Sequence, residues 1–146
     1  MTKIILITLI PEQMKWFSGP YSIISRVSDQ NVQPYLDRAR QELRAVEINI
    51  REELYPVAIS RTYYAVFYAA SAVLASIGIA RSKHTGVISA FRHHFIKSGL
   101  LEPEFGDILG VSFDARQESD YELIPYIDYN LAIKRYGDAK RFVERV

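Results

Sequence analysis

The chain has 146 residues and a formal net charge of +1, with 49% hydrophobic and 24% charged residues, a composition typical of one globular domain and not of a disordered chain. The near-neutral charge excludes a global field that would draw the protein onto DNA or a membrane, so nucleic-acid binding would need a local basic patch. The absence of cysteine excludes disulfides, thiolate metal sites and cysteine nucleophiles, and it fits a reducing cytosol.

The first thirty residues carry no clear helical period. The apolar run at positions 4–10 is far shorter than the ~20 residues that a membrane-spanning helix needs, and Gly19 with Pro20 predicts a chain break. We interpret residues 1–30 as an N-terminal extension that is flexible or precedes the natural start of the protein. No signal-peptide cleavage site follows the apolar run, so we expect no secretion.

From residue 31 the pattern becomes helical. Pro34 suits the first turn of a helix, and apolar residues then recur at spacings of three and four up to Ile50. A second helix is predicted over residues 56–77, with Gly78 as its stop. It is apolar nearly all round, which is typical of the most buried helix of a bundle.

Three more helices are predicted further along the chain. One covers residues 85–97 and is closed by Ser98 and Gly99, one opens at residues 102–104, and the last follows Pro125. No long strand candidate follows residue 30. The predicted fold is therefore all-α, a mostly antiparallel bundle of four to five helices over residues 31–146.

The second helix carries an aromatic stripe, since Tyr64, Phe67, Tyr68 and Ser71 recur at spacings of three and four. Core packing is the favoured interpretation for its aromatic residues. Arg61 lies on the same apolar helix, where a buried arginine must be paired. We expect its partner among the carboxylates of the fourth helix.

The fourth helix carries Arg116 in strongly acidic surroundings. Between Glu102 and Glu122 there are seven acidic residues and one base, so phosphate is repelled there unless Arg116 lies in a cleft or other basic residues approach it. Because Arg116 and Asp120 are four apart, the simplest interpretation is an intrahelical ion pair contributing ~0.3–0.5 kcal/mol.

Other basic residues lie at positions 81–97 and on the last helix, where a solvated surface is their simplest role. All three histidines fall in the first stretch. His93 and His94 are adjacent, so on a helix they point about 100° apart and do not share a metal easily. His84 precedes a helix start, where capping or packing is its simplest role. We expect no metal site.

Three segments, in this order, resemble the HEPN domain family: residues 60–70 (SRTYYAVFYAA), 83–88 (KHTGVI) and 116–121 (RQESDY). The resemblance is to small prokaryotic HEPN proteins in which an arginine is followed by Asp-Tyr, and it covers about residues 31–146. It implies a four- to five-helix bundle that forms a homodimer about the helix bearing the arginine. It also implies a minimal nucleotidyltransferase as partner, in a toxin–antitoxin pair.

In the best-understood branch of that family, an arginine and a histidine separated by four to six residues form a metal-independent ribonuclease site, which the partner silences by adenylylating a tyrosine. The matching positions here are Tyr121, Glu122 and Leu123, so this histidine is absent. Cleavage by a 2′-hydroxyl needs a base, an acid and a cation. Arg116 supplies the cation, whereas Asp120 or Glu118 acts as a base only with a raised pKa.

The sequence leaves two functions open. The first is a HEPN component of a HEPN/nucleotidyltransferase pair that binds RNA or nucleotide, with ribonuclease activity centred on Arg116. The second is a non-catalytic dimer module that binds a nucleotide or a partner protein. A third interpretation is that the polar residues only fix helix packing. We expect a cytoplasmic protein that binds no membrane and needs no cofactor.

Seven residues are the predicted site. The catalytic residues are expected near the two-fold cleft of the dimer, and the substrate-binding residues on the second helix and before the third. The catalytic group is Arg116, Asp120 and Tyr121, and the substrate-binding group is Arg61, Tyr64, Lys83 and His84.

Overall fold

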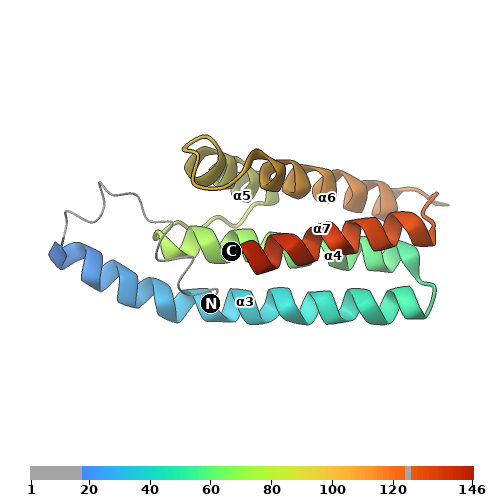
Figure 1. Cartoon of the computed structure of the whole chain (residues 1–146), viewed down its shortest axis with the longest axis horizontal. Coiled ribbons are helices and arrows are strands. Elements are labelled where there is room, and N and C mark those ends of the chain that lie inside the picture. Colours follow the sequence, from blue (N-terminus) through green and yellow to red (C-terminus); the bar gives the residue numbers. More distant parts are fainter. Residues whose placement is uncertain (1–17, 124–125) are drawn as a thin grey trace.

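The structure, a computed structural model, describes residues 18–123 and 126–146, with side chains from Val32 onward (Figure 1). Every regular element in these residues is helical, which confirms the all-α prediction. The elements are α3 (Ser18–Arg51), α4 (Tyr55–Ser76), α5 (His84–Phe91), the π-helical turn η1 (Arg92–Ile96), α6 (Pro103–Tyr121) and α7 (Tyr129–Arg145).

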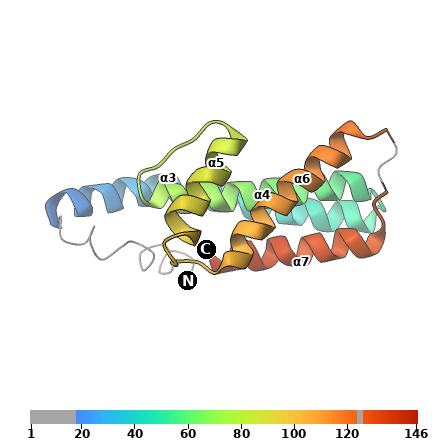
Figure 2. The same ribbon diagram turned by 90° about the horizontal axis from the view of Figure 1, so that it is seen from above.

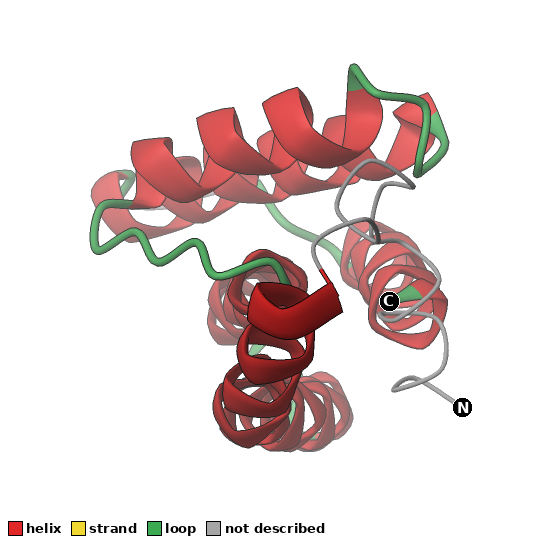
Figure 3. Ribbon diagram, turned by 90° about the vertical axis from the view of Figure 1, so that its left-hand side faces the viewer, coloured by secondary structure: helices red, strands yellow, loops and turns green. Residues whose placement is uncertain are grey.

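The helices form two layers. α3, α4 and α7 run along the long axis of the molecule, and α6 lies obliquely across α4 and α7 (Figures 1 and 2). In the end-on view, α5 and α6 form the upper layer and run transverse to α3, α4 and α7 (Figure 3). α4 contacts α3, α5, α6 and α7, so it is the central helix of the bundle, as its apolar circumference predicted.

The residues of α4 explain why it is central. Small side chains such as Ala65, Ala69 and Ala72 are fully buried and let the neighbouring helices approach closely, while Tyr63 fills the space between them. By length and hydropathy α4 could also cross a membrane, but two thirds of its most apolar stretch is buried inside the bundle. Its apolar character is therefore explained by its place in the core.

The first helix differs from the prediction. α3 begins at Ser18, so residues 18–30 are helical, and Pro20 lies near the helix start, where its missing N–H breaks no hydrogen bond. Pro34 lies inside α3 and not in its first turn. A proline removes one backbone hydrogen bond, but each further helical residue adds one, so the helix continues past it. Residues 1–17, which contain the apolar run at positions 4–10, lie outside the described residues.

The helix ends follow the predicted glycines. Gly78 has a φ of 75°, and Ile79 N–H donates to the Leu74 carbonyl oxygen at 2.9 Å, which closes the end of α4. Gly99, with a φ of 78°, ends the turn that follows η1. Because residues other than glycine rarely adopt these left-handed angles, the two stop signals were readable from the sequence.

The basic face of α7 does more than face solvent. Arg141 and Arg145 each lie 3.2 Å from a carboxylate at the start of α6, Glu104 and Glu102 respectively. All four side chains are at least one-third exposed, so water and salt screen both pairs. The interpretation of this face as a solvated surface agrees with this exposure, and the two arginines in addition connect α7 to α6.

Candidate functional site

A buried tyrosine connects α4 to the start of α5. Tyr63 is fully buried, and its hydroxyl forms a 2.6 Å hydrogen bond with Nδ1 of His84, the first residue of α5. The His84 ring also packs 4.7 Å from the Phe67 ring and 6.4 Å from the Phe113 ring, measured between centroids. His84 is thus held between α4 and α6 and does not cap a helix with its side chain.

Arg116 reaches the same place from α6. Its guanidinium carbon lies 5.9 Å from the centre of the Tyr63 ring and 5.4 Å from that of Tyr64. Its Nε is 2.9 Å from Asp120 Oδ2, which confirms the predicted ion pair. However, the buried Nε–H makes no hydrogen bond, and the two terminal amino groups have no ion-pair or hydrogen-bond partner among the described residues. Arg116 is therefore held by this ion pair and by the two tyrosine rings, with no further hydrogen bond among the described residues.

Arg61 has a different partner from the one predicted. Its Nη1 lies 3.3 Å from Oε2 of Glu42 on α3, and not against a carboxylate of α6. Glu42 is only 4% exposed and also accepts a 3.1 Å hydrogen bond from Arg38 Nε. At the level of Arg61, α4 packs against α3, so a buried carboxylate of α3 neutralises it. The prediction of a partner on the fourth helix is wrong for this reason.

These contacts line up three arginines beside two tyrosines. Arg38 lies 5.5 Å from the Tyr68 ring centre and Arg61 lies 4.8 Å from that of Tyr64, where Arg116 also approaches. The three arginine side chains are 49%, 34% and 24% exposed. We call these five residues the arginine–tyrosine face. Among the described residues its ion-pair partners are Glu42 and Asp120 alone, so three arginines face two carboxylates and the face keeps a net positive charge.

The surroundings fix the protonation of both partners of the short hydrogen bond. Burial raises the pKa of the Tyr63 hydroxyl well above its ordinary value of 10, so it keeps its proton. Burial also lowers the pKa of His84, and the positive charge of Arg116 lowers it further. His84 is therefore neutral near pH 7.

The structure brings together five of the seven predicted site residues: Arg61, Tyr64, His84, Arg116 and Asp120. Tyr121 is 83% exposed at the end of α6 and Lys83 is also exposed; neither side chain contacts the other five among the described residues. Arg38, Glu42 and Tyr63 were missed by the sequence analysis. The i, i+4 spacing of Arg38 and Glu42 was a readable signal, whereas nothing local distinguished Tyr63 from the other aromatic residues of α4.

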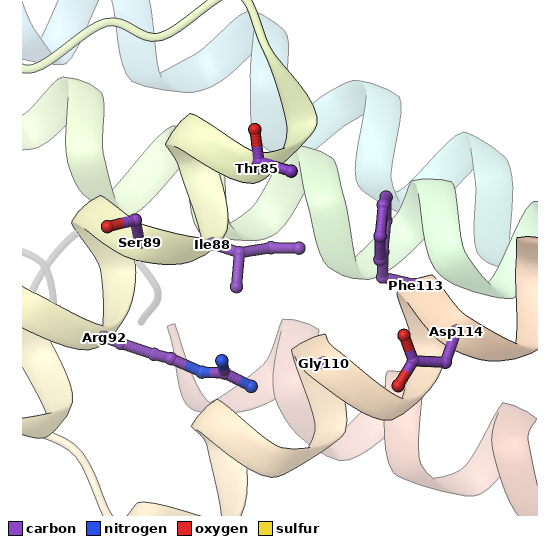
Figure 4. A pocket seen from close by; sticks show the side chains of 7 residues that line it. All are labelled: Thr85, Ile88, Ser89, Arg92, Gly110, Phe113 and Asp114. Atoms are coloured by element: carbon purple, nitrogen blue, oxygen red, sulfur yellow. The ribbon is translucent and has the colours of Figure 1, made fainter.

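A surface pocket of about 440 Å³ adjoins the site between α5 and α6 (Figure 4). The Arg92 side chain extends across it toward Gly110, and the Asp114 carboxylate lies beyond (Figure 4). Phe113 lines the pocket and also packs near His84, so the two regions are continuous. Within the described residues, no group of three or more His, Asp and Glu is arranged to hold a metal ion.

The fold is a helical bundle in which the arginine–tyrosine face lies beside the central helix α4. The HEPN domain model matches residues 32–146, and the chain belongs to the HEPN domain family. It is 37% identical over 95 residues to a UPF0332 protein of Thermotoga maritima, covering 64% of this chain and 72% of that protein.

Two proteins of Methanocaldococcus jannaschii that bear the name "Putative toxin" are also similar to the chain. One is 29% identical over 125 residues, which cover 86% of this chain and 92% of that protein. The other is 32% identical over 93 residues, which cover 64% of this chain and 63% of that protein.

Proposed function

We propose that the protein is the toxin-side component of a HEPN/nucleotidyltransferase pair and that it binds RNA at the arginine–tyrosine face. The observation that carries the proposal is Arg116, whose terminal amino groups have no partner among the described residues although the side chain is three-quarters buried. A guanidinium in this state is available for an anion. The names of the two Methanocaldococcus relatives support the toxin-like role.

The chemistry of the face favours RNA over other anions. Arginines neutralise the phosphates of a single strand, and exposed aromatic rings stack on its bases. Arg38 of α3 lies against the half-buried ring of Tyr68, and Arg61 of α4 lies against that of Tyr64, so cations and aromatic rings stand together on this face. This local patch replaces the global basic charge that the protein lacks.

Metal-independent cleavage centred on Arg116 is the catalytic form of this proposal. In this form Arg116 stabilises the negative charge that develops on the phosphate oxygens, and the Asp120 carboxylate, 2.9 Å from Arg116 Nε, accepts a proton. The alternative is a binding module without turnover. Its specific support is that Tyr121 does not reach Arg116, so one chain does not assemble the predicted catalytic group.

A homodimer and a nucleotidyltransferase partner belong to the same proposal, as does a cytoplasmic location. The surface near the end of α6 offers a contact area, because it exposes large apolar side chains to an unusual degree. These residues, with their exposed fractions, are Tyr121 (83%), Leu123 (97%), Tyr126 (91%) and Tyr129 (53%).

The test is cleavage and binding of a labelled single-stranded RNA by the purified protein in EDTA, without a partner. Arg116→Ala is compared with Arg145→Ala, which removes an equal charge from the exposed pair between α7 and α6. Cleavage that is lost only in Arg116→Ala supports the ribonuclease. Binding without cleavage, again dependent on Arg116, supports the binding module, and no binding by the folded wild-type protein refutes both.

A further inference from the structure

The hydrogen bond between Tyr63 and His84 has a definite direction. The Tyr63 hydroxyl is fully buried, and its one hydrogen-bond partner among the described residues is His84 Nδ1. If Nδ1–H were the donor, the hydroxyl proton would be left buried without an acceptor, which is unfavourable. Tyr63 therefore donates, Nδ1 accepts, and a neutral His84 carries its own proton on Nε2.

His84 and Arg116 lie against the same two tyrosine rings. The His84 ring is 5.6 Å from the Tyr63 ring and 6.1 Å from the Tyr64 ring, and the Arg116 guanidinium carbon is 5.9 Å and 5.4 Å from the same two rings. Both side chains thus flank one pair of tyrosines, from α5 and from α6. Arg116 brings N–H groups that have no hydrogen-bond partner among the described residues, and His84 brings a further donor.

We propose that Tyr63 fixes His84 as the neutral Nε2–H tautomer and that His84 and Arg116 together form a binding site for one phosphate group of RNA. The RNA part rests on the function proposed above, whereas the tautomer and the phosphate site are features of this chain by themselves. Tyr63 is a positioning residue, since it acts on the ligand only through His84. A cation and a neutral donor side by side match a singly charged phosphodiester.

The Nε2–H tautomer excludes a role for His84 as general base. An imidazole that already carries a proton on Nε2 offers no lone pair to a 2′-hydroxyl, so His84 does not replace the histidine that the Arg116 motif lacks. Protonation would place a second proton on Nδ1, against the Tyr63 hydroxyl and close to Arg116. The groups facing His84 are Tyr63, Tyr64 and Phe67 from α4 and Phe113 and Arg116 from α6; none of them is a carboxylate that would stabilise the charged ring.

The first experiment is long-range ¹H–¹⁵N NMR of the histidine rings in the full chain. The wild type should show His84 as the Nε2–H tautomer, with a pKa below 6.5. Tyr63→Phe removes only the hydroxyl that stabilises the neutral ring and should raise that pKa. Tyr64→Phe is the control, because the Tyr64 hydroxyl makes no hydrogen bond to the described residues. An Nδ1–H tautomer in the wild type, or equal effects of the two variants, overturns the proposal.

The second experiment titrates inorganic phosphate and then a 2′-O-methyl RNA that cannot be cleaved by its own hydroxyl. We expect saturable changes at His84 Nε2–H and the Arg116 guanidinium, with binding about ten- to hundredfold weaker in His84→Phe. His84→Gln keeps an N–H donor and should lose less. If the protein binds phosphate but no RNA, the proposed function is refuted and the phosphate site of His84 and Arg116 is supported. If His84→Phe binds RNA as tightly as the wild type, the phosphate site is refuted and the RNA-binding function is supported.

Discussion

Glu42→Gln should lower stability and raise RNA affinity at the same time. The substitution keeps the size of the side chain but removes the negative charge that Arg38 and Arg61 share, at N–O distances of 3.1 Å and 3.3 Å. Glu42 itself is buried, whereas its partners are 49% and 34% exposed, so water replaces part of what they lose. The loss therefore lies between that of a surface pair and a buried pair, at about 1–2 kcal/mol.

The same change frees two arginines of the arginine–tyrosine face. If both then contact phosphates, the dependence of log K on log salt should become steeper by about 0.7 for each new contact with a single strand. The midpoint of thermal unfolding should fall by about 2–8 °C. The assays are thermal unfolding by circular dichroism and fluorescence anisotropy with labelled RNA at several salt concentrations.

Asp37→Asn is the matched control, because it removes one negative charge from the same helix at an exposed position. We expect it to change stability by less than about 0.5 kcal/mol and to leave the salt dependence close to that of the wild type. If Glu42→Gln is as stable as this control and shows the same salt dependence, Glu42 does not restrain the two arginines and the reasoning fails.

Three further predictions concern the core, the pocket and alkaline pH. Phe142→Ala, at a fully buried ring, should lower the free energy of unfolding by about 3–5 kcal/mol, and a loss below 1 kcal/mol in chemical denaturation would contradict the packing. Gly110→Ala would place Cβ 2.3 Å from Arg92 Nη2, but the flexible end of Arg92 can move. The free energy of unfolding, measured by thermal unfolding, should therefore stay unchanged or rise by up to about 1 kcal/mol. A clear fall in stability would show that Arg92 is fixed. Burial and the hydrogen bond to Glu47 raise the pKa of Tyr136 to about 12, above the ordinary 10, so stability should fall as pH rises between these values; a tyrosine absorbance titration in which Glu47→Gln has no effect would refute the assignment.

Local rules were enough for most of the fold. The spacing of apolar residues predicted the helices after residue 31, and the glycines at 78 and 99 predicted where two segments end. The Arg116–Asp120 pair was also predictable, because residues four apart on a helix are neighbours whatever surrounds them. Pro34 shows the limit of such rules, since its position near a pattern change suggested a helix start and α3 extends well beyond it.

The sequence by itself therefore determined the elements and the contacts within each helix. Only the tertiary structure decided which helix faces which: Arg61 pairs with Glu42, 19 residues away, and Tyr63 bonds to His84, 21 residues away. Tyr63 and Tyr64 are adjacent and chemically identical, yet one is buried and holds a histidine while the other lies at the surface beneath two arginines. The rotation of α4 about its axis makes this difference, and that rotation is set by the simultaneous packing of its neighbours, which no local pattern encodes.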